Sequence, residues 1–113
     1  MQIFFSKNFK QQLKKLKKKF PNIKNDLLEK LSWLNFENEI YIGKSIYTIR
    51  IKSSDQNKGK SGGFRVYIYF YIRKNLLVPL CIYSKSDKEN ISENELQYYF
   101  DQTIEEMLQR FLL

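Results

Sequence analysis

Residues 58 to 73 join a glycine-rich basic loop to a strand-like stretch in which cations and tyrosines alternate with apolar residues. At the two-residue period of a strand, one face is apolar and the other carries charge and phenol rings. The second face consists of Arg65, Tyr67, Tyr69, Tyr71 and Arg73. Fixed charge binds phosphate and flat rings stack on unpaired bases, so this face predicts binding of single-stranded RNA. The alternative is an outer sheet face rich in tyrosine only because tyrosine suits strands.

The chain contains no histidine and a single cysteine, Cys81. A Ser-His-Asp or Cys-His arrangement is therefore impossible, and a transition-metal site of ordinary type is excluded. Acid–base chemistry would have to come from lysine, tyrosine or carboxylates, and the carboxylates are too scattered to favour a paired-carboxylate hydrolase. We expect no metal and no cofactor, and we expect Cys81 to be a buried structural thiol.

The net charge of +8 is distributed unevenly. Residues 1 to 88 carry about +13, whereas residues 89 to 113 carry about −5 and contain only one cation, Arg110. A body this basic favours polyanions or an acidic protein partner. The first residues lack the apolar stretch of a signal peptide and no long apolar run follows, so we expect a cytoplasmic protein without membrane association. The length predicts one domain, residues 1–113.

Helical periodicity precedes the strands. Residues 2 to 5 predict at most one short strand, after which Ser6 or Asn8 caps a helix that Pro21 closes. Asn22 or Asn25 begins a second helix, so the two form a helical hairpin. The expected core residues of these helices are Phe9, Leu13, Leu16, Phe20, Ile23, Leu27, Leu28, Leu31 and Leu34. The lysine-rich outer face of the first helix, with Lys14 and Lys18, either is merely solvated or contributes to nucleic-acid binding.

Three strands and a long helix follow. The period is two from Ser45 to Lys52, and residues 76 to 83 form a further strand in which Pro79 implies an edge position or a bulge. Ser92 and Glu95 form a capping box for the C-terminal helix, whose apolar stripe predicts core, with part left for a partner or a second copy. The fold class is therefore α+β, with a small, mainly antiparallel sheet, an N-terminal helical hairpin on one face and a long C-terminal helix.

This element order, together with Lys58-Gly-Lys-Ser-Gly-Gly-Phe-Arg65 and Tyr83-Ser-Lys85-Ser-Asp-Lys88, resembles the RelE/ParE superfamily of bacterial type II toxin–antitoxin systems. Within it, the chain looks closest to the RelE-like toxins also called HigB-type. The resemblance covers residues 40 to 95 well and the rest by architecture. It implies a RelE-like fold and a ribosome-dependent mRNA endoribonuclease that inhibits translation, with the ribosome, mRNA and a cognate antitoxin as partners. In such toxins the RNA 2′-hydroxyl attacks the adjacent phosphate without metal, and lysine and arginine replace the histidines of ordinary ribonucleases.

The resemblance also implies roles for individual residues. Arg65 matches the arginine that stabilises the phosphate. Arg50 matches a basic residue on the preceding strand, and Lys85 matches a basic residue after the last one. The family tyrosine of the C-terminal segment has no clear counterpart, so Tyr83 or a strand tyrosine would substitute for it, and Lys60 of the loop is the candidate to replace a missing catalytic charge. From the pattern of the residues themselves, the expected RNA-binding residues are Lys58, Tyr67, Tyr69, Arg73, Lys88, Lys14 and Lys18. Ser86 stands where a second basic residue is expected, and Thr48 stands where RelE itself has a lysine. These departures leave the general acid and base unassigned.

Two alternatives remain open at this point. ParE-type relatives share the fold but inhibit DNA gyrase without this RNA chemistry. The basic face could instead belong to a non-catalytic RNA-binding module, or dock an acidic antitoxin segment. A gyrase inhibitor has no need for Arg50, Arg65 and Lys85 on one face, so their position in the fold discriminates between these functions.

Overall fold

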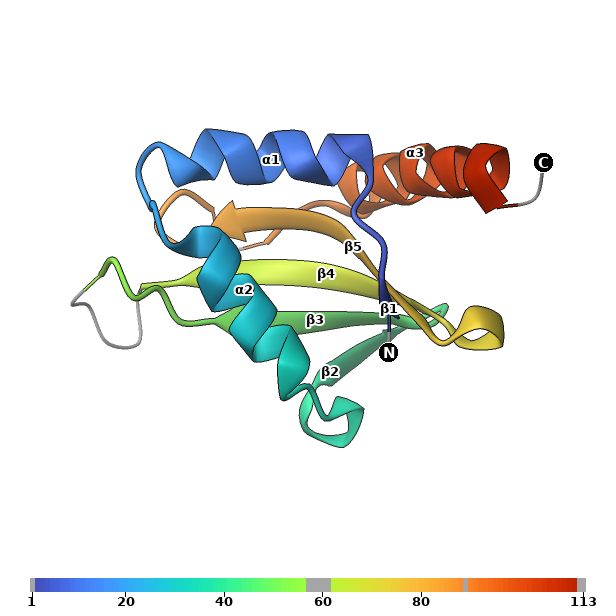
Figure 1. Ribbon diagram of the computed structural model, residues 1–113, viewed down its shortest axis with the longest axis horizontal. Helices are drawn as coiled ribbons and strands as arrows, with labels where there is room; N and C mark the ends of the chain where they lie inside the picture. Colours follow the sequence, from blue (N-terminus) through green and yellow to red (C-terminus); the bar gives the residue numbers. More distant parts are fainter. Residues whose placement is uncertain (1, 57–61, 89, 112–113) are drawn as a thin grey trace.

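A five-stranded sheet forms the centre of the computed structural model, which describes residues 2–56, 62–88 and 90–111 (Figure 1). The strands are β1 (Gln2–Ile3), β2 (Ile40–Gly43), β3 (Ile46–Ile51), β4 (Phe64–Tyr71) and β5 (Leu76–Ser84), in the spatial order β1-β5-β4-β3-β2. The helices are α1 (Lys7–Lys17), α2 (Ile23–Ser32) and α3 (Glu93–Phe111), with short 3₁₀ helices at Phe36–Asn38 and Ile72–Lys74. Neighbouring strands are antiparallel except β1, which lies parallel to β5. The predicted α+β class is confirmed, whereas strand β2 was not predicted.

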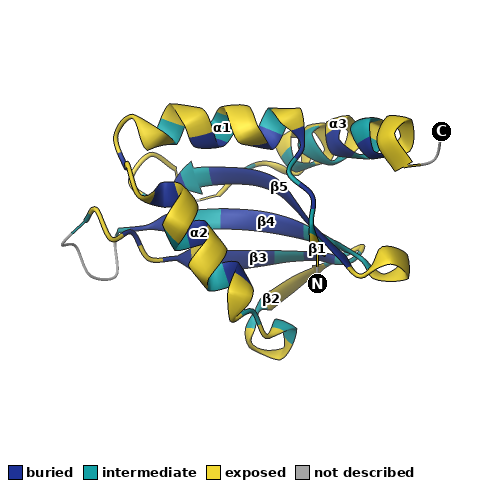
Figure 2. Cartoon of the chain, viewed as in Figure 1, coloured by how far each residue is buried: buried dark blue, intermediate teal, exposed yellow. Residues whose placement is uncertain are grey.

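Helices cover both faces of the sheet and bury one apolar cluster on each (Figure 2). The cluster under α1 and α2 contains Phe9, Leu13, Phe20, Ile23, Leu27 and Leu31 packed on Ile49, Ile51, Phe64, Val66 and Ile68. The cluster under α3 contains Met107 packed with Ile46, Tyr67, Val78, Leu80 and Cys81. The helical hairpin therefore covers one face, as predicted. Leu28 is 37% exposed and was wrongly predicted as core, because it lies about 100° around α2 from Leu27.

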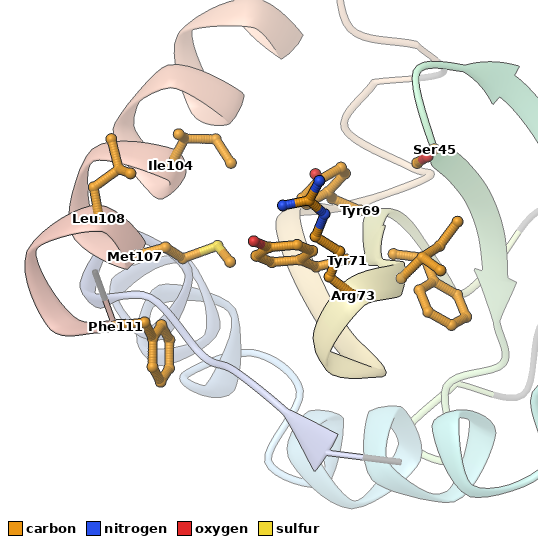
Figure 3. A pocket seen from close by; sticks show the side chains of 10 residues that line it. Ser45, Tyr69, Tyr71, Arg73, Ile104, Met107, Leu108 and Phe111 are labelled. Carbon is orange, nitrogen blue, oxygen red and sulfur yellow. The ribbon is translucent and has the colours of Figure 1, made fainter.

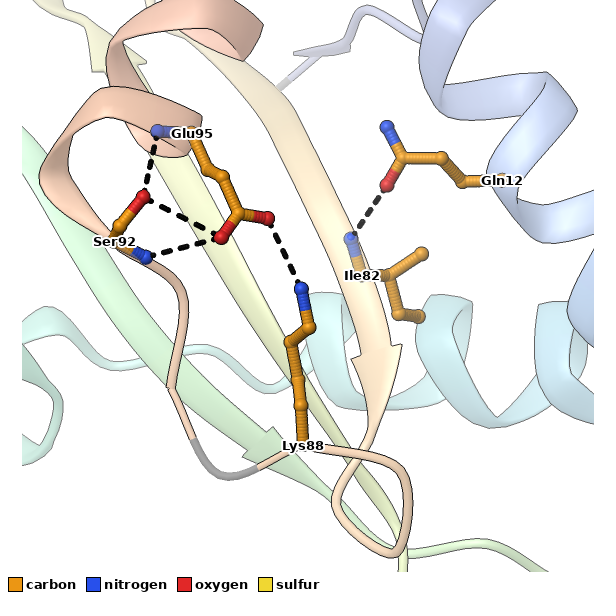
Figure 4. Close-up of polar contacts among 5 residues, drawn as sticks. All are labelled: Gln12, Ile82, Lys88, Ser92 and Glu95. Carbon is orange, nitrogen blue, oxygen red and sulfur yellow. Dashed lines mark hydrogen bonds and ion pairs between the residues drawn. The ribbon is translucent and has the colours of Figure 1, made fainter.

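Local capping explains where the helices begin. The Ser6 side chain accepts a hydrogen bond of 3.0 Å from the Phe9 amide, so Ser6 and not Asn8 caps α1. At α3, the Glu95 amide donates to Ser92 Oγ at 3.1 Å, while the Ser92 amide donates to Glu95 Oε1 at 3.4 Å (Figure 4). This reciprocal pair is the predicted capping box. In the described part of the chain, no helix combines the length and apolarity needed to cross a bilayer.

The free edge of β5 is protected by a side chain of α1. Strand β1 pairs with the first two residues of β5, and no other strand of residues 2–56, 62–88 and 90–111 pairs with the rest of this edge. The Ile82 amide donates to Gln12 Oε1 at 2.9 Å (Figure 4). Gln12 Nε2 donates to the Leu80 carbonyl at 3.4 Å. Pro79 lies at a bulge, since Cys81 faces Tyr67 while Pro79 faces Ile68. The bulge predicted from Pro79 is confirmed.

The β2–β3 hairpin turns through two residues with left-handed backbone, Lys44 (φ 53°) and Ser45 (φ 63°). Two-residue hairpin loops of this kind favour Asn-Gly, because side chains larger than glycine are strained at positive φ. We predict that the double variant Lys44→Asn, Ser45→Gly is more stable by about 1 kcal/mol, the strain being relieved at Ser45 above all. Urea denaturation measures the change. Ser45→Ala keeps the strain and serves as the control, and equal stability of both variants would contradict the prediction.

Candidate functional site

Three of the predicted catalytic residues lie side by side across the sheet. Arg50 of β3 is the register partner of Arg65 of β4, and Arg65 is the register partner of Tyr83 of β5. Directly opposite residues of antiparallel strands point to the same face with Cβ atoms about 4.5–5.5 Å apart. The three side chains therefore form one row, here called the Arg-Tyr row, on the face that α3 covers farther along. The positive charges of Arg50 and Arg65 lie directly opposite one another, and their repulsion lowers the stability of the strand pair. Residues that reduce stability in this way are typical of binding sites.

Arg65 is half-buried and held from one side. Its Nη1 donates a hydrogen bond of 3.2 Å to Thr48 Oγ1, and Thr48 is itself buried. Its Nε is buried and has no hydrogen-bond partner among the described residues. A buried donor without a partner is costly, and a guanidinium presents its donors as a planar fork that suits phosphate oxygens. Arg65 is thus fixed in orientation while retaining donor capacity for an anion.

Tyr83 supplies a proton donor at the end of the Arg-Tyr row. Burial raises the pKa of the Tyr83 phenol, and a hydrogen bond with Tyr67 raises it further, while the positive charge of Arg65 lowers it to a smaller extent. A phenol with a raised pKa stays protonated throughout the physiological range. Tyr83 can therefore donate a proton or a hydrogen bond, but it cannot act as a base at neutral pH.

Lys85 adds charge beside the Arg-Tyr row. Its amide donates to the Gly63 carbonyl at 3.0 Å, which ties the chain after β5 to the start of β4. Lys85 and Arg50 both line a groove of about 950 Å³ that runs between the sheet and α2. Lys52 and Trp33 also line it. The structure therefore places Arg50, Arg65, Tyr83 and Lys85 in one region.

The tyrosines of β4 do not form the open stacking face that was predicted. Tyr67 is 7% exposed and belongs to the cluster under α3, so its assignment as an exposed RNA-stacking residue is wrong. Tyr69 packs edge-on against Phe100 of α3, with ring centroids 5.3 Å apart. The reason is that the apolar stripe of α3 must be buried, and the tyrosine face of β4 is where it packs. Tyr69 and Tyr71 stay half-buried and line a groove against α3, so the face is partly accessible there and at its Arg65 end.

The remaining predicted RNA-binding residues are dispersed. Lys88 forms an ion pair of 3.0 Å with Glu95, and this hydrogen bond raises the pKa of Lys88. Lys14 and Lys18 are exposed on or just after α1, the helix that packs on the opposite face of the sheet from the Arg-Tyr row. Lys58 and Lys60 lie outside the described residues.

Arg73 lies at the other end of β4 from Arg65, in the short 3₁₀ helix that follows the strand. It lines a second groove, of about 410 Å³, between the end of β4 and the C-terminal half of α3 (Figure 3). The opposite wall carries Met107, Leu108 and Phe111. Arg73 follows Arg65 by eight positions, so the two stand roughly 25 Å apart at strand spacing and cannot share one phosphate.

Cys81 is a buried thiol, as predicted, with 1% of its surface exposed. Burial is the main reason that the pKa of its thiol rises to about 12, so the reactive thiolate is scarce at neutral pH. Within residues 2–56, 62–88 and 90–111, no three histidine, cysteine or carboxylate side chains are grouped so as to hold a metal ion.

Two residues of this region were missed in the sequence. Thr48 was noted only as a departure from RelE, although its hydroxyl accepts the hydrogen bond that orients Arg65. Trp33 was not considered, although it lines the same groove as Arg50. A signal existed for Trp33, because it comes two residues after Leu31 and thus about 200° around the helix from the core stripe. A large apolar residue placed there points away from the core.

Comparison with known proteins supports the architecture. No protein-family model matches the chain, and no curated protein matches it in sequence. Among solved structures, the toxin RelE of E. coli, in the free state and with two arginines replaced by alanine, superposes with a TM-score of 0.52. The two sequences are 16% identical over 95% of this chain and 97% of that chain. At this identity the likeness establishes the fold alone, and on that ground this protein has a RelE-like fold.

Proposed function

We propose that this protein is the toxin of a toxin–antitoxin pair and cuts mRNA on the ribosome, acting in the cytoplasm. The observation that carries the proposal is the register of Arg50, Arg65 and Tyr83 in one row across three adjacent strands. The RelE-like fold agrees with it. The basic loop before β4 and the Tyr83-x-Lys85-x-x-Lys88 segment favour the HigB-type branch of these toxins.

The proposed reaction is a transfer within the RNA. The 2′-oxygen of one nucleotide forms a bond to its 3′-phosphorus, the bond from phosphorus to the next 5′-oxygen breaks, and a 2′,3′-cyclic phosphate and a 5′-hydroxyl result. Negative charge develops on the non-bridging oxygens, where Arg65 donates from its planar fork and Arg50 adds a second positive charge. Tyr83, protonated because its pKa is raised, donates a proton to the departing 5′-oxygen.

The proton of the attacking 2′-hydroxyl passes to solvent water, which also returns a proton to Tyr83 after the 5′-oxygen has left. Neither guanidinium can accept the 2′-hydroxyl proton, and a phenol with a raised pKa is occupied by its own proton. The rate must therefore come mainly from orientation of the RNA and from stabilisation of charge on the phosphate. A ribosome that holds the message in a bent, aligned conformation supplies that orientation.

We predict that cleavage depends on the ribosome. The purified protein is expected to cut mRNA in programmed ribosomes at least about 10²-fold faster than the same free mRNA, because alignment of the reacting atoms is worth several orders of magnitude. Single-turnover cleavage assays with matched RNA concentrations measure both rates. Equal rates on free and ribosome-bound mRNA would contradict the dependence.

A control in cells separates this function from inhibition of DNA gyrase. Expression of the protein alone should stop incorporation of labelled amino acids before incorporation of labelled thymidine falls. Early loss of DNA synthesis with trapped gyrase complexes would instead support the gyrase function. Co-expression with the cognate antitoxin, whose acidic segment is expected to cover the basic face, should restore growth.

A further inference from the structure

We propose that Trp33 is a stacking platform for a base of single-stranded RNA, in a binding site that continues from the Arg-Tyr row into the groove beside α2. The inference rests on the proposed function for the identity of its ligand. It adds a binding residue outside the row and a site for a nucleotide next to the phosphate that is cut.

The exposure of Trp33 is the first observation. This residue is the only tryptophan of the chain, and 83% of its surface is exposed. It belongs to neither apolar cluster of the core, so packing does not account for it. Tryptophan is usually well buried, and an indole left in solvent beside a groove indicates a surface that binds something flat and apolar.

The charges around the groove are the second observation. Arg50, Lys52 and Lys85 line it together with Trp33. Two carboxylates, Asp26 and Glu29, also line it. The Asp26 carboxylate accepts hydrogen bonds from the Ser54 amide at 3.0 Å and the Ser54 hydroxyl at 3.2 Å, while Glu29 keeps one negative charge among the cations. The Asp26 charge is thus engaged in joining α2 to the loop after β3. The groove therefore presents several cations next to one exposed indole.

This combination favours RNA over an acidic peptide. A single-stranded nucleic acid alternates phosphates with flat bases, and its proteins use cations for the first and aromatic rings for the second. An acidic peptide would use the cations but would leave the indole without a matching flat partner. Arg50 belongs to both the Arg-Tyr row and the groove, although α2 packs on the opposite face of the sheet from the row. Among the described residues β2 pairs with β3 only as far as Thr48, so an RNA strand in the groove would reach the row around the edge of β3 at Arg50.

The single tryptophan makes the experiment site-specific, because all indole fluorescence of the protein comes from Trp33. The probe is a short 2′-O-methyl oligoribonucleotide, which keeps bases and phosphates but cannot undergo attack by a 2′-hydroxyl. At low salt it is expected to quench the fluorescence, while an abasic oligonucleotide of equal length and charge is expected to quench little. Binding of the labelled oligonucleotide, followed by anisotropy, should weaken about 10- to 100-fold in Trp33→Ala, in line with about 1–3 kcal/mol per stacked base. Trp33→Phe should recover most of this loss.

Tyr98→Ala is the matched control, since Tyr98 is a 55% exposed aromatic residue of α3 that lines neither groove. It should bind the oligonucleotide as the parent does, and melting curves should show that all three variants fold. Equal quenching by the abasic oligonucleotide, parental binding by Trp33→Ala, or stronger Trp33-dependent binding of an acidic peptide would each overturn the inference.

The two proposals fail separately. If Trp33→Ala binds the oligonucleotide and cuts mRNA on ribosomes as the parent does, the stacking inference is wrong and the ribonuclease stands. If the parent cuts no mRNA on ribosomes but stacks bases on Trp33, the platform stands and the protein is an RNA-binding module.

Discussion

Replacement of Arg65 by alanine is expected to slow single-turnover cleavage on saturating ribosomes by about 10²-fold or more, the scale of removing one electrostatic stabiliser from a transition state. The structural reason is that Arg65 occupies the centre of the Arg-Tyr row, with Arg50 on one side and Tyr83 on the other. Its orientation is fixed by Thr48, so little reorganisation is needed when the phosphate binds. Folding should change little, because the lost hydrogen bond to Thr48 is offset by relief of repulsion from Arg50.

Three variants sharpen this test. Arg65→Lys should also cut more slowly than the parent, because a point charge does not reproduce a planar contact with two phosphate oxygens. Thr48→Val removes the hydroxyl that orients Arg65 and should reduce the cleavage rate less than Arg65→Ala does. Arg73→Ala removes an arginine at the far end of the same strand and should cut at close to the parental rate. If folded Arg65→Ala cuts at the parental rate, Arg65 has no catalytic role.

Much of the candidate site follows from two-residue periodicity. Alternation alone places Arg65 and Tyr67 on one face of β4, and alternation in β3 places Thr48 and Arg50 on one face. Register decides the rest, because it determines which residue of β3 or β5 faces Arg65. Register depends on the turn at Lys44 and Ser45 and on the bulge at Pro79, and the sequence indicates only the second of these.

The covering of the tyrosine face could not be predicted from β4 alone. A strand with one apolar and one tyrosine-rich face is compatible with either an open or a covered outer face. The face is covered because the apolar stripe of α3, with Leu96, Tyr99 and Phe100, packs against Tyr69 and its neighbours. Helical spacing predicted this stripe, but it does not say which face of the sheet the stripe contacts. That choice depends on the direction of the chain after β5.

Strand β2 was missed for a related reason. Ile40, Tyr41 and Ile42 are consecutive and exposed, so they show no alternation that would distinguish a strand from a loop. The strand exists because its backbone pairs with β3. Pairing with a neighbouring strand contributes stability that the alternation pattern of β2 itself does not show.

Gly63→Ala is expected to produce the largest loss of stability among these variants, at least about 3 kcal/mol. Gly63 has φ +90°, in the left-handed region that strains other residues, and an added Cβ would come within 2.3 Å of the Ile51 carbonyl oxygen. That oxygen belongs to the backbone of β3, so it cannot move away without separating β3 from β4. The same glycine accepts the hydrogen bond from the Lys85 amide, so its displacement also disturbs the region around the Arg-Tyr row.

Gly43→Ala provides the matched control, because Gly43 has a similar backbone (φ +97°) but no atom within 4 Å of an added Cβ. Its variant should therefore show the backbone strain alone, about 1–2 kcal/mol. Urea denaturation of both variants, with m-values compared to the parent, gives the two free energies of unfolding. The difference between them measures the clash with Ile51. Equal losses would mean that β3 and β4 can part at this point without cost, and the close approach of Gly63 to Ile51 would then not be what fixes the start of β4 and the position of Arg65.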